Sequence, residues 1–494
     1  MTPAANVRRE VLAERAFGAD RRGRAALWLA AALLSAATIW FGLGPHDEGL
    51  MLQAARRIAD GQLPYRDFWW NYGPGQPYLL SPFGGSLVAW RVIRVALDAT
   101  VALLAYELAA RLIARARDGV RPAGAVVDRP RWLDALPLLA WVAVAGAMAF
   151  PTGPGPNPAA LALGLGALLL APRHVAVAGI LAGLAAVFRI EIGVAAALGV
   201  AIAGAPRALA WAAGTAVLGW LPFLIAAPGD LIEDTLGFLG VQGMKRRPFP
   251  LDPSGVGLDP NKLLELWLPA ILVIGCALWL VRRTALVLAP LLVVSLAYLL
   301  GRTDEFHLVP LAVVLPIALV AAAAAERVRA LRIAALAVVG LIALHGLERK
   351  AGELLHLPAT APIDGVRGEA AEVRAIDATL AAIDGRSIYV VPPRTDRLTV
   401  GNPLLYVLAG ADNPTRYDVM QPGVVTERDV QEEIIADLER ARPQMLVRWL
   451  DPRTAPEDNA SGRERGSTLL DAYLRRTYGA RPRRFGPFEV SERR

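Results

Sequence analysis

Eight long apolar stretches constrain the fold of this chain more than any other feature. They are Ala25–Leu43, Leu87–Ile113, Trp132–Phe150, Ala208–Ala227, Leu263–Val281, Ala285–Leu300, Leu308–Ala325 and Leu331–Leu347. Most of them match the roughly 20 residues that an α-helix needs to cross about 30 Å of hydrocarbon. The whole chain of 494 residues is 55% hydrophobic and only 20% charged, which is more apolar than ordinary soluble proteins. We therefore predict an α-helical membrane protein with many spans.

The region between Phe150 and Arg207 departs from this pattern. Its apolar runs are only about 13 to 15 residues long and reach about 21 Å, because Pro, Gly or charged residues interrupt them. We predict short or re-entrant helices inside the bundle, with Arg189 and Glu191 near the outer leaflet, where charged side chains usually line a site. A structural Arg/Glu pair is the alternative. The preferred total is about 11 crossings, whereas one long helix over 175–204 would move the C-terminus to the cytoplasm.

Arginine clusters predict the orientation, because basic residues favour the cytoplasmic side of a membrane. Arg8, Arg9, Arg21, Arg22 and Arg24 precede the first apolar stretch, so residues 1–24 are expected in the cytoplasm. The membrane region then covers residues 25–347. Its expected outer segments are a first loop at 44–82, a second, large loop at 228–262 and a turn at 301–307. The remainder of the chain also lies outside in this topology.

Residues 348–494 have the pattern of a small soluble α/β domain. Helical spacing in residues 368–384, 426–443 and 467–478 alternates with strand-like runs at 387–393, 444–450 and 485–490. The domain contains no Gly-rich phosphate loop, nucleophile elbow or His/Cys cluster. We therefore expect no catalytic centre within it.

The first outer loop begins with two adjacent acids, Asp47 and Glu48. The residues that follow them alternate between apolar and polar with helical spacing, which predicts an amphipathic helix lying at the membrane interface. Acidic residues also favour the first turn of any helix, so an ordinary helix start is the alternative explanation. Aromatic residues between Tyr65 and Tyr72 then predict an interfacial belt, some of whose members stack on a substrate.

This loop resembles the GT-C glycosyltransferases, within them most closely the branch of the protein O-mannosyltransferases and the lipid A aminoarabinose transferase. The similar segment is "DEGLMLQAARRIADGQLPYRDFWWNYGPGQP", with the acidic pair and the pattern G-x-x-P-Y-x-D at Gly61–Asp67. Weaker matches are "GRTDEFHL" and "NPLLYVLAG". The resemblance implies an inverting transferase that uses a polyprenyl-phosphate-linked sugar at the outer face of the plasma membrane. The acceptor would be a lipid, a protein or a cell-wall glycan.

The resemblance also implies roles for the acids of the loop. Asp47 is the candidate base for the acceptor hydroxyl, a task that a carboxylate within hydrogen-bond reach performs. Adjacent helical residues point about 100° apart, so Glu48 is expected to assist by orienting a neighbouring group. Asp67 is a candidate second carboxylate of the site.

Cations are needed to stabilise the phosphate that leaves. The candidates on the outer side, together with one aromatic substrate contact, are Arg302, His307, Arg189, Lys245, Arg246 and Tyr65. Asp304 and His307 are three residues apart and with Asp47 could hold a divalent metal, so metal dependence stays open.

Two other classes of function were weighed. A transporter or flippase for a lipid-linked or anionic substrate would also use broken helices with charged residues, but the acids gather at one face and the two halves show no repeat. Nucleic-acid binding is not expected despite the net charge of +7, because the basic residues form short separate groups rather than one face.

Overall fold

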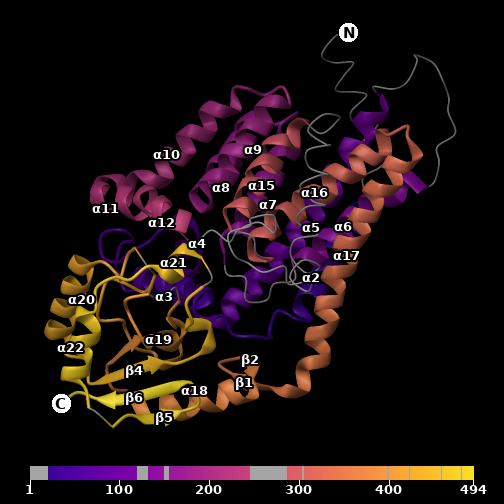
Figure 1. Ribbon diagram of the computed structural model, residues 1–494. Helices are drawn as coiled ribbons and strands as arrows, with labels where there is room; N and C mark the ends of the chain where they lie inside the picture. Colours follow the sequence, from indigo (N-terminus) through magenta and orange to yellow (C-terminus); the bar gives the residue numbers. More distant parts are fainter. Residues whose placement is uncertain are drawn as a thin grey trace.

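The computed structural model describes residues 20–118, 132–148, 155–244, 286–302, 305–397, 400–421, 423–457, 459–479 and 481–494. Over these ranges the chain is mostly helical, with a small sheet region near the C-terminus (Figure 1). The helices gather into a bundle, and the sheet with its helices lies at one end of that bundle. The mainly helical chain with a small C-terminal α/β region agrees with the sequence.

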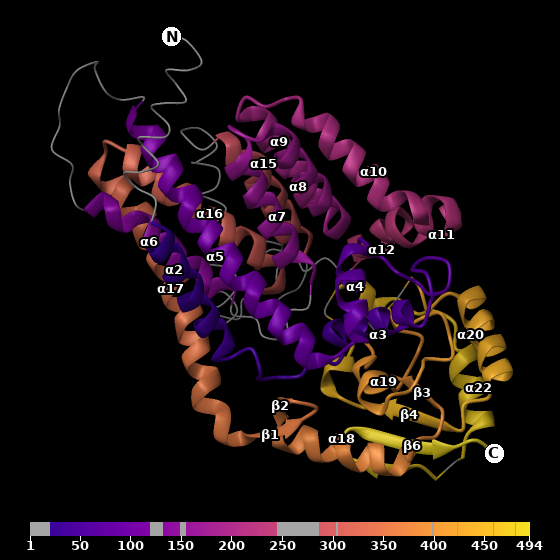
Figure 2. The same ribbon diagram turned by 180° about the vertical axis from the view of Figure 1, so that it is seen from behind.

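The bundle is made of ten helices among the described residues. They are α2 (Arg21–Ala36), α5 (Leu87–Asp118), α6 (Trp132–Ala147), α7 (Asn157–Leu170), α8 (Val175–Phe188), α9 (Ile190–Ile202), α10 (Ala208–Ala226), α15 (Ala289–Gly301), α16 (Glu305–Ala325) and α17 (Arg329–His356). In both views α10 lies at one side and α17 at the other, with α7, α15 and α16 between them (Figures 1 and 2). Small and aliphatic residues fill the core, and α16 is buried along nearly its whole length.

Three described helices are long and apolar enough to cross a membrane by length and composition. They are Ala208–Ala226, His307–Ala325 and Arg329–Ala359. The first predicted stretch gives a shorter helix, because α2 ends at Ala36 and the chain turns before it reaches Leu43. The stretch Leu263–Val281 lies outside the described residues.

The region predicted to hold short helices does hold them. α7, α8 and α9 contain 14, 14 and 13 residues. Between α8 and α9 the chain is broken at Arg189, whose backbone is extended with φ −144° and ψ 108°. One continuous helix over 175–204 is therefore not formed.

The predicted helix of the first outer loop is confirmed as α3 (Asp47–Ala59), followed by α4 (Gly75–Leu80) and the 3₁₀ turn η1 (Ser81–Phe83). Its polar face, which the sequence predicts to be exposed, is partly buried. Gln53 and Arg57 on the polar face are buried together with the apolar face, because the C-terminal region covers that side of the helix (Figure 1). The aromatics Phe68, Trp69 and Trp70 are also buried in this shared core rather than exposed as a belt.

The C-terminal region contains a hairpin and a four-stranded sheet. The hairpin pairs β1 (Thr360–Ile363) with β2 (Val366–Glu369), and the sheet has the order β3 (Ile388–Val391), β4 (Met445–Trp449), β6 (Phe488–Glu492) and β5 (Arg483–Phe485). Strands β3 and β4 are parallel, and the other neighbours are antiparallel. The helices are α18 (Ala370–Ile383), α19 (Leu404–Ala409), α20 (Arg428–Ala441), α21 (Ala460–Arg463) and α22 (Leu469–Thr477). The three helices and the strands β3 and β4 expected from the periodicity of this region are confirmed. The single closing strand expected at 485–490 is instead a hairpin, in which β5 ends at Phe485 and β6 begins at Phe488, with Gly486 at φ +55° in the turn.

The remaining described elements are short connections. They are α11 (Pro228–Ile232), the π-helical turn η2 (Glu233–Gly237), α12 (Phe238–Met244), η4 (Leu286–Leu288), η5 (Leu357–Ala359) and η6 (Pro452–Thr454). Helix α17 continues to His356, so it extends past the predicted boundary between residues 347 and 348 and leads directly into the C-terminal region.

Candidate functional site

The loop at residues 44–82, predicted to be the first outer loop, packs directly on the end of α8, next to the break between α8 and α9. Gly73 touches the last turn of α8 so closely that an added Cβ would lie 2.2 Å from the Val187 carbonyl oxygen and 2.8 Å from that of Phe188. At Gly75 an added Cβ would lie 2.9 Å from the Phe188 ring. Only glycine allows this approach. The contact holds the backbone next to Tyr72 against the end of α8.

Tyr72 is the centre of a cluster of charged side chains. Burial and the charge of the Asp47 carboxylate raise the pKa of the Tyr72 phenol, whereas the charges of Arg189 and Arg302 lower it. All three charged groups therefore lie within electrostatic range of one tyrosine. The predicted base, Asp47, and two of the predicted cations thus lie within electrostatic range of the same side chain, although these residues are far apart in the sequence.

Tyr298 on α15 is the second aromatic of this cluster. The Arg189 guanidinium lies over its ring, 4.6 Å from the centroid, and the His307 ring of α16 is 4.3 Å away between centroids. Tyr298 thereby joins Arg189 and His307 on the same side of the bundle. We call Asp47, Tyr72, Arg189, Tyr298 and Arg302 the outer cluster.

The two arginines of the outer cluster already have carboxylate neighbours. Arg302 forms an ion pair with Glu457 of the C-terminal region, with Nη1 donating to Oε2 at 3.0 Å. Arg189 donates from Nε to Oε1 of Glu191 at 2.6 Å. The C-terminal region therefore reaches the edge of the outer cluster through Glu457. An anionic ligand of Arg302 would have to share that arginine with Glu457.

Asp47 and Glu48 lie in different surroundings. Asp47 is exposed, and it forms no ion pair with any residue that the structure describes. Glu48 is fully buried and pairs with Arg91 of α5, with Nε 2.8 Å from Oε1. Arg91 also donates to the carbonyl oxygen of Gly42 at 3.0 Å. Glu48 thus holds the turn before α3 to the bundle and leaves Asp47 as the accessible acid. A role of Glu48 in the reaction stays a prediction.

Asp67 and Tyr65 organise the turn that precedes the aromatics. The Asp67 carboxylate accepts from the Leu63 amide at 2.7 Å and pairs with Arg66, whose hydrogen bond holds the pKa of Asp67 below its usual value. Tyr65 is fully buried with φ +70°, and its hydroxyl donates to the Tyr72 carbonyl oxygen at 2.6 Å. Both side chains are used in the fold of the loop, and their direct contact with substrate stays a prediction.

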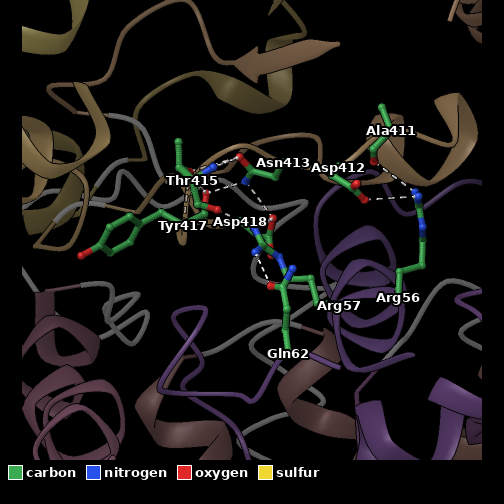
Figure 3. A network of polar contacts seen from close by, with 9 residues as sticks. All are labelled: Arg56, Arg57, Gln62, Ala411, Asp412, Asn413, Thr415, Tyr417 and Asp418. Atoms are coloured by element: carbon green, nitrogen blue, oxygen red, sulfur yellow. Dashed lines mark hydrogen bonds and ion pairs between the residues drawn. The ribbon is translucent and has the colours of Figure 1, made fainter. Parts of the chain in front are cut away.

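A buried polar network holds α3 against the C-terminal region (Figure 3). The pair between Arg57 and Asp418 has Nε and Oδ2 2.8 Å apart, with both side chains nearly inaccessible. Arg57 also donates to the Thr415 carbonyl oxygen, and Asn413 donates to Asp418 at 2.8 Å. Gly49 adds a close backbone contact, because a Cβ there would lie 2.1 Å from the Leu404 nitrogen. The segment 401–421 therefore fixes the helix that begins with Asp47.

Some of the predicted residues cannot be placed. Lys245, Arg246 and Asp304 lie outside the described residues. Within the described part of the chain, no group of three or more His, Cys, Asp or Glu side chains has the arrangement of a metal site.

Sequence reasoning did not single out Tyr298, Asn157 or Arg91. Tyr298 and Asn157 lie beside Arg189 in space, but a lone tyrosine in an apolar helix and an asparagine at a helix start carry no distinctive spacing. The sequence could have indicated Arg91, because a charged residue inside the apolar stretch Leu87–Ile113 needs a buried partner. Its partner is Glu48.

The outer cluster combines an accessible carboxylate with arginines at the ends of short, broken helices. This arrangement suits proton removal by the acid and stabilisation of a negative charge by the guanidinium groups. Comparisons of the chain with protein-family models, with curated proteins and with solved structures found no match.

Proposed function

We propose that this chain is an integral membrane glycosyltransferase. It moves a sugar from a polyprenyl-phosphate-linked donor to a lipid, protein or glycan acceptor, with inversion at the anomeric carbon. The observation that supports this proposal best is the outer cluster, in which the accessible Asp47 lies within electrostatic range of Tyr72, as do Arg189 and Arg302. The first-loop resemblance to GT-C enzymes points to the same chemistry.

In the proposed reaction Asp47 accepts the proton of the acceptor hydroxyl while that oxygen attacks the anomeric carbon. The bond between this carbon and the donor phosphate oxygen breaks, and the electron pair leaves with the phosphate. Arg189 stabilises the charge on the polyprenyl phosphate, because a guanidinium pairs well with phosphate oxygens. The N-terminus of α9, which starts at Ile190, adds a favourable dipole at the same point.

The proposed setting is the plasma membrane, with about 11 crossings and both the outer cluster and the C-terminal region outside the cell. Three helices of sufficient length and apolarity support the membrane part of this proposal. The exposed apolar residues of α10, among them Leu218 and Ile225, also suit contact with lipid chains. A polar solvent would make such a continuous apolar face unfavourable.

A transporter of an anionic lipid is the second candidate, because α8 and α9 form a helix pair broken at charged Arg189. Broken helices of this kind often bind substrate in transporters. The two candidates differ in their need for Asp47. A transporter moves its substrate without a base for an acceptor hydroxyl.

The test is an Asp47→Asn variant, assayed for sugar transfer from polyprenyl-phosphate donors in membranes or detergent. We expect turnover to fall about 100-fold or more, because a positioned general base contributes a factor of about 10²–10⁴. Asp60→Asn is the matched control, since Asp60 is an exposed acid at the other end of α3. Turnover by Asp47→Asn at the level of the control would remove Asp47 as the base.

A further inference from the structure

The helical run that follows α10 has two sides of different character. α11, η2 and α12 continue without a break from Pro228 to Met244. Three apolar residues of this run, Ile232, Leu236 and Leu239, are 55%, 63% and 63% exposed. Their spacing of four and three residues places them on one side of a helix. We call these three residues the apolar stripe.

The other side of the run is fixed to the protein. It carries Leu231, Asp234 and Phe238, which are all buried. The Asp234 carboxylate accepts a hydrogen bond from the Trp70 amide at 3.1 Å, and the Phe238 ring lies edge-on to that of Trp69, with 5.1 Å between centroids. The apolar stripe therefore cannot turn inward unless these contacts break.

Helix α10 sets the level of the run relative to a membrane. It is long and apolar enough to cross one, and the chain leaves it at Ala227, where φ is −154° and ψ is 65°. α11 begins at the next residue, and both views show it at the end of α10 (Figures 1 and 2). A helix that starts where a span ends lies at the level of the membrane surface.

Exposed apolar side chains lead from α10 into the run. Leu221, Leu224 and Ile225 in the last turns of α10 are exposed, as is the apolar stripe that follows them. A protein partner could cover a single stripe. An apolar surface that also extends along a candidate span favours acyl chains as the occupant, because the same lipid phase contacts both.

We propose that residues 228–244 lie in the membrane surface at the C-terminal end of α10, with the apolar stripe among the lipid acyl chains. Helices of this kind place their apolar side about 5–10 Å into the boundary between headgroups and chains. The buried side of the run then holds Trp69 and Trp70, and with them the loop between α3 and α4, at the level of the headgroups. This inference rests on the membrane setting of the proposed function and is independent of the reaction.

The test places single fluorescent labels on the full-length protein in phosphatidylcholine and phosphatidylglycerol vesicles. Cys276→Ala removes the one native cysteine. In this background Leu236→Cys and Leu239→Cys each carry an environment-sensitive label on the stripe. Leu218→Cys on α10 reports insertion of the bundle, and Arg484→Cys labels an exposed position on the edge strand β5. The vesicles contain lipids with a spin label either near the headgroup or near the bilayer centre.

We expect a blue-shifted emission at both stripe positions, with a larger loss of fluorescence from the shallow spin label than from the deep one. The label at position 218 should lose more fluorescence to the deep spin label, because it lies about 12 Å along the helix axis from the end of α10. The label at position 484 should be quenched by neither lipid.

Three results at the stripe would overturn the inference. A blue-shifted emission without quenching would mean that another part of the chain or a second copy covers the stripe. Emission typical of water without quenching would mean that the stripe faces solvent. Stronger quenching by the deep spin label would mean that the run enters the bilayer instead of lying in its surface.

The label on α10 separates this inference from the proposed function. Quenching at position 218 together with any of the three contrary results leaves the membrane setting in place and removes only the surface position of residues 228–244. Absence of quenching at positions 218, 236 and 239 would remove the membrane setting and this inference together.

Discussion

Gly73 shows how a single residue controls the geometry of the outer cluster. An added Cβ would lie 2.2 Å from the Val187 carbonyl oxygen, and backbone on both sides leaves no flexible side chain to move away. We therefore expect Gly73→Ala to push the loop off α8 and to carry Tyr72 away from Arg189. A displacement of about 1 Å at a reacting centre can lower activity about 100-fold.

The measurement for Gly73→Ala is sugar transfer under the conditions used for Asp47→Asn. The matched control is Gly229→Ala, since an added Cβ at Gly229 meets nothing within 4 Å. Equal activity of the two variants would show that the close contact at Gly73 has no influence on the site.

The buried carboxyl of Asp234 should make the stability of the folded protein depend on pH. Burial raises the pKa of its carboxyl to about 7, although the hydrogen bond from the Trp70 amide, 3.1 Å long, and the charge of Arg416 lower it. The folded protein therefore binds more protons than the unfolded chain between about pH 4 and pH 7. Its stability should fall as the pH rises through this window.

Asp234→Asn removes the titration and keeps an oxygen that accepts from Trp70. We expect the variant to lose part of the decrease in thermal midpoint that the wild type shows between pH 5 and pH 8. Asp230→Asn is the control, because Asp230 also lies near Arg416 but is 43% exposed. Parallel curves for wild type and Asp234→Asn would contradict the expected proton uptake.

At the scale of elements, α3 is held in place by contacts with the C-terminal region. The Asp418 side chain, which pairs with Arg57, is 1% exposed. The Asp412 side chain is 80% exposed, and its Oδ1 atom lies 3.6 Å from Nη2 of Arg56. Loss of one partner of a buried ion pair costs about 3–5 kcal/mol. An exposed pair contributes about 0–1 kcal/mol.

We therefore expect Asp418→Asn to destabilise the docked C-terminal region strongly and Asp412→Asn to leave it almost unchanged. Hydrogen exchange of the α3 and 401–421 amides measures the docking, and thermal unfolding measures the stability. Faster exchange in both segments is expected only for Asp418→Asn. Similar exchange in the two variants would mean that the buried pair does not hold α3 in place.

At the scale of the whole molecule, the proposed topology places the outer cluster and the C-terminal region on the same, outer side of the membrane. Arg302 and Glu457 already form an ion pair between the bundle and the C-terminal region. A reporter fused after Arg494 should therefore be active outside the cytoplasm. A reporter that is active in the cytoplasm would place the outer cluster on the cytoplasmic side and would exclude the proposed outer-face reaction.

Local patterns in the sequence predicted several elements well. The helix at Asp47, the short helices around Arg189 and the alternating elements after residue 360 follow from periodicity, charge and Gly/Pro positions, which act over a few neighbouring residues. The burial of part of the polar face of α3 does not follow from such local patterns. Its residues have the spacing of an exposed face, but the C-terminal segment 401–421, distant in sequence, covers them.

The sequence by itself determined the kind of protein: long apolar helices, an acidic first loop and a small α/β region are consequences of composition and spacing. Only the tertiary structure decided which charged residues meet. Asp47, Tyr72, Arg189 and Tyr298 come from four elements or loops, and their approach depends on helix packing and on contacts such as that of Gly73 with α8. Such contacts join residues far apart in the chain, and local sequence patterns do not indicate them.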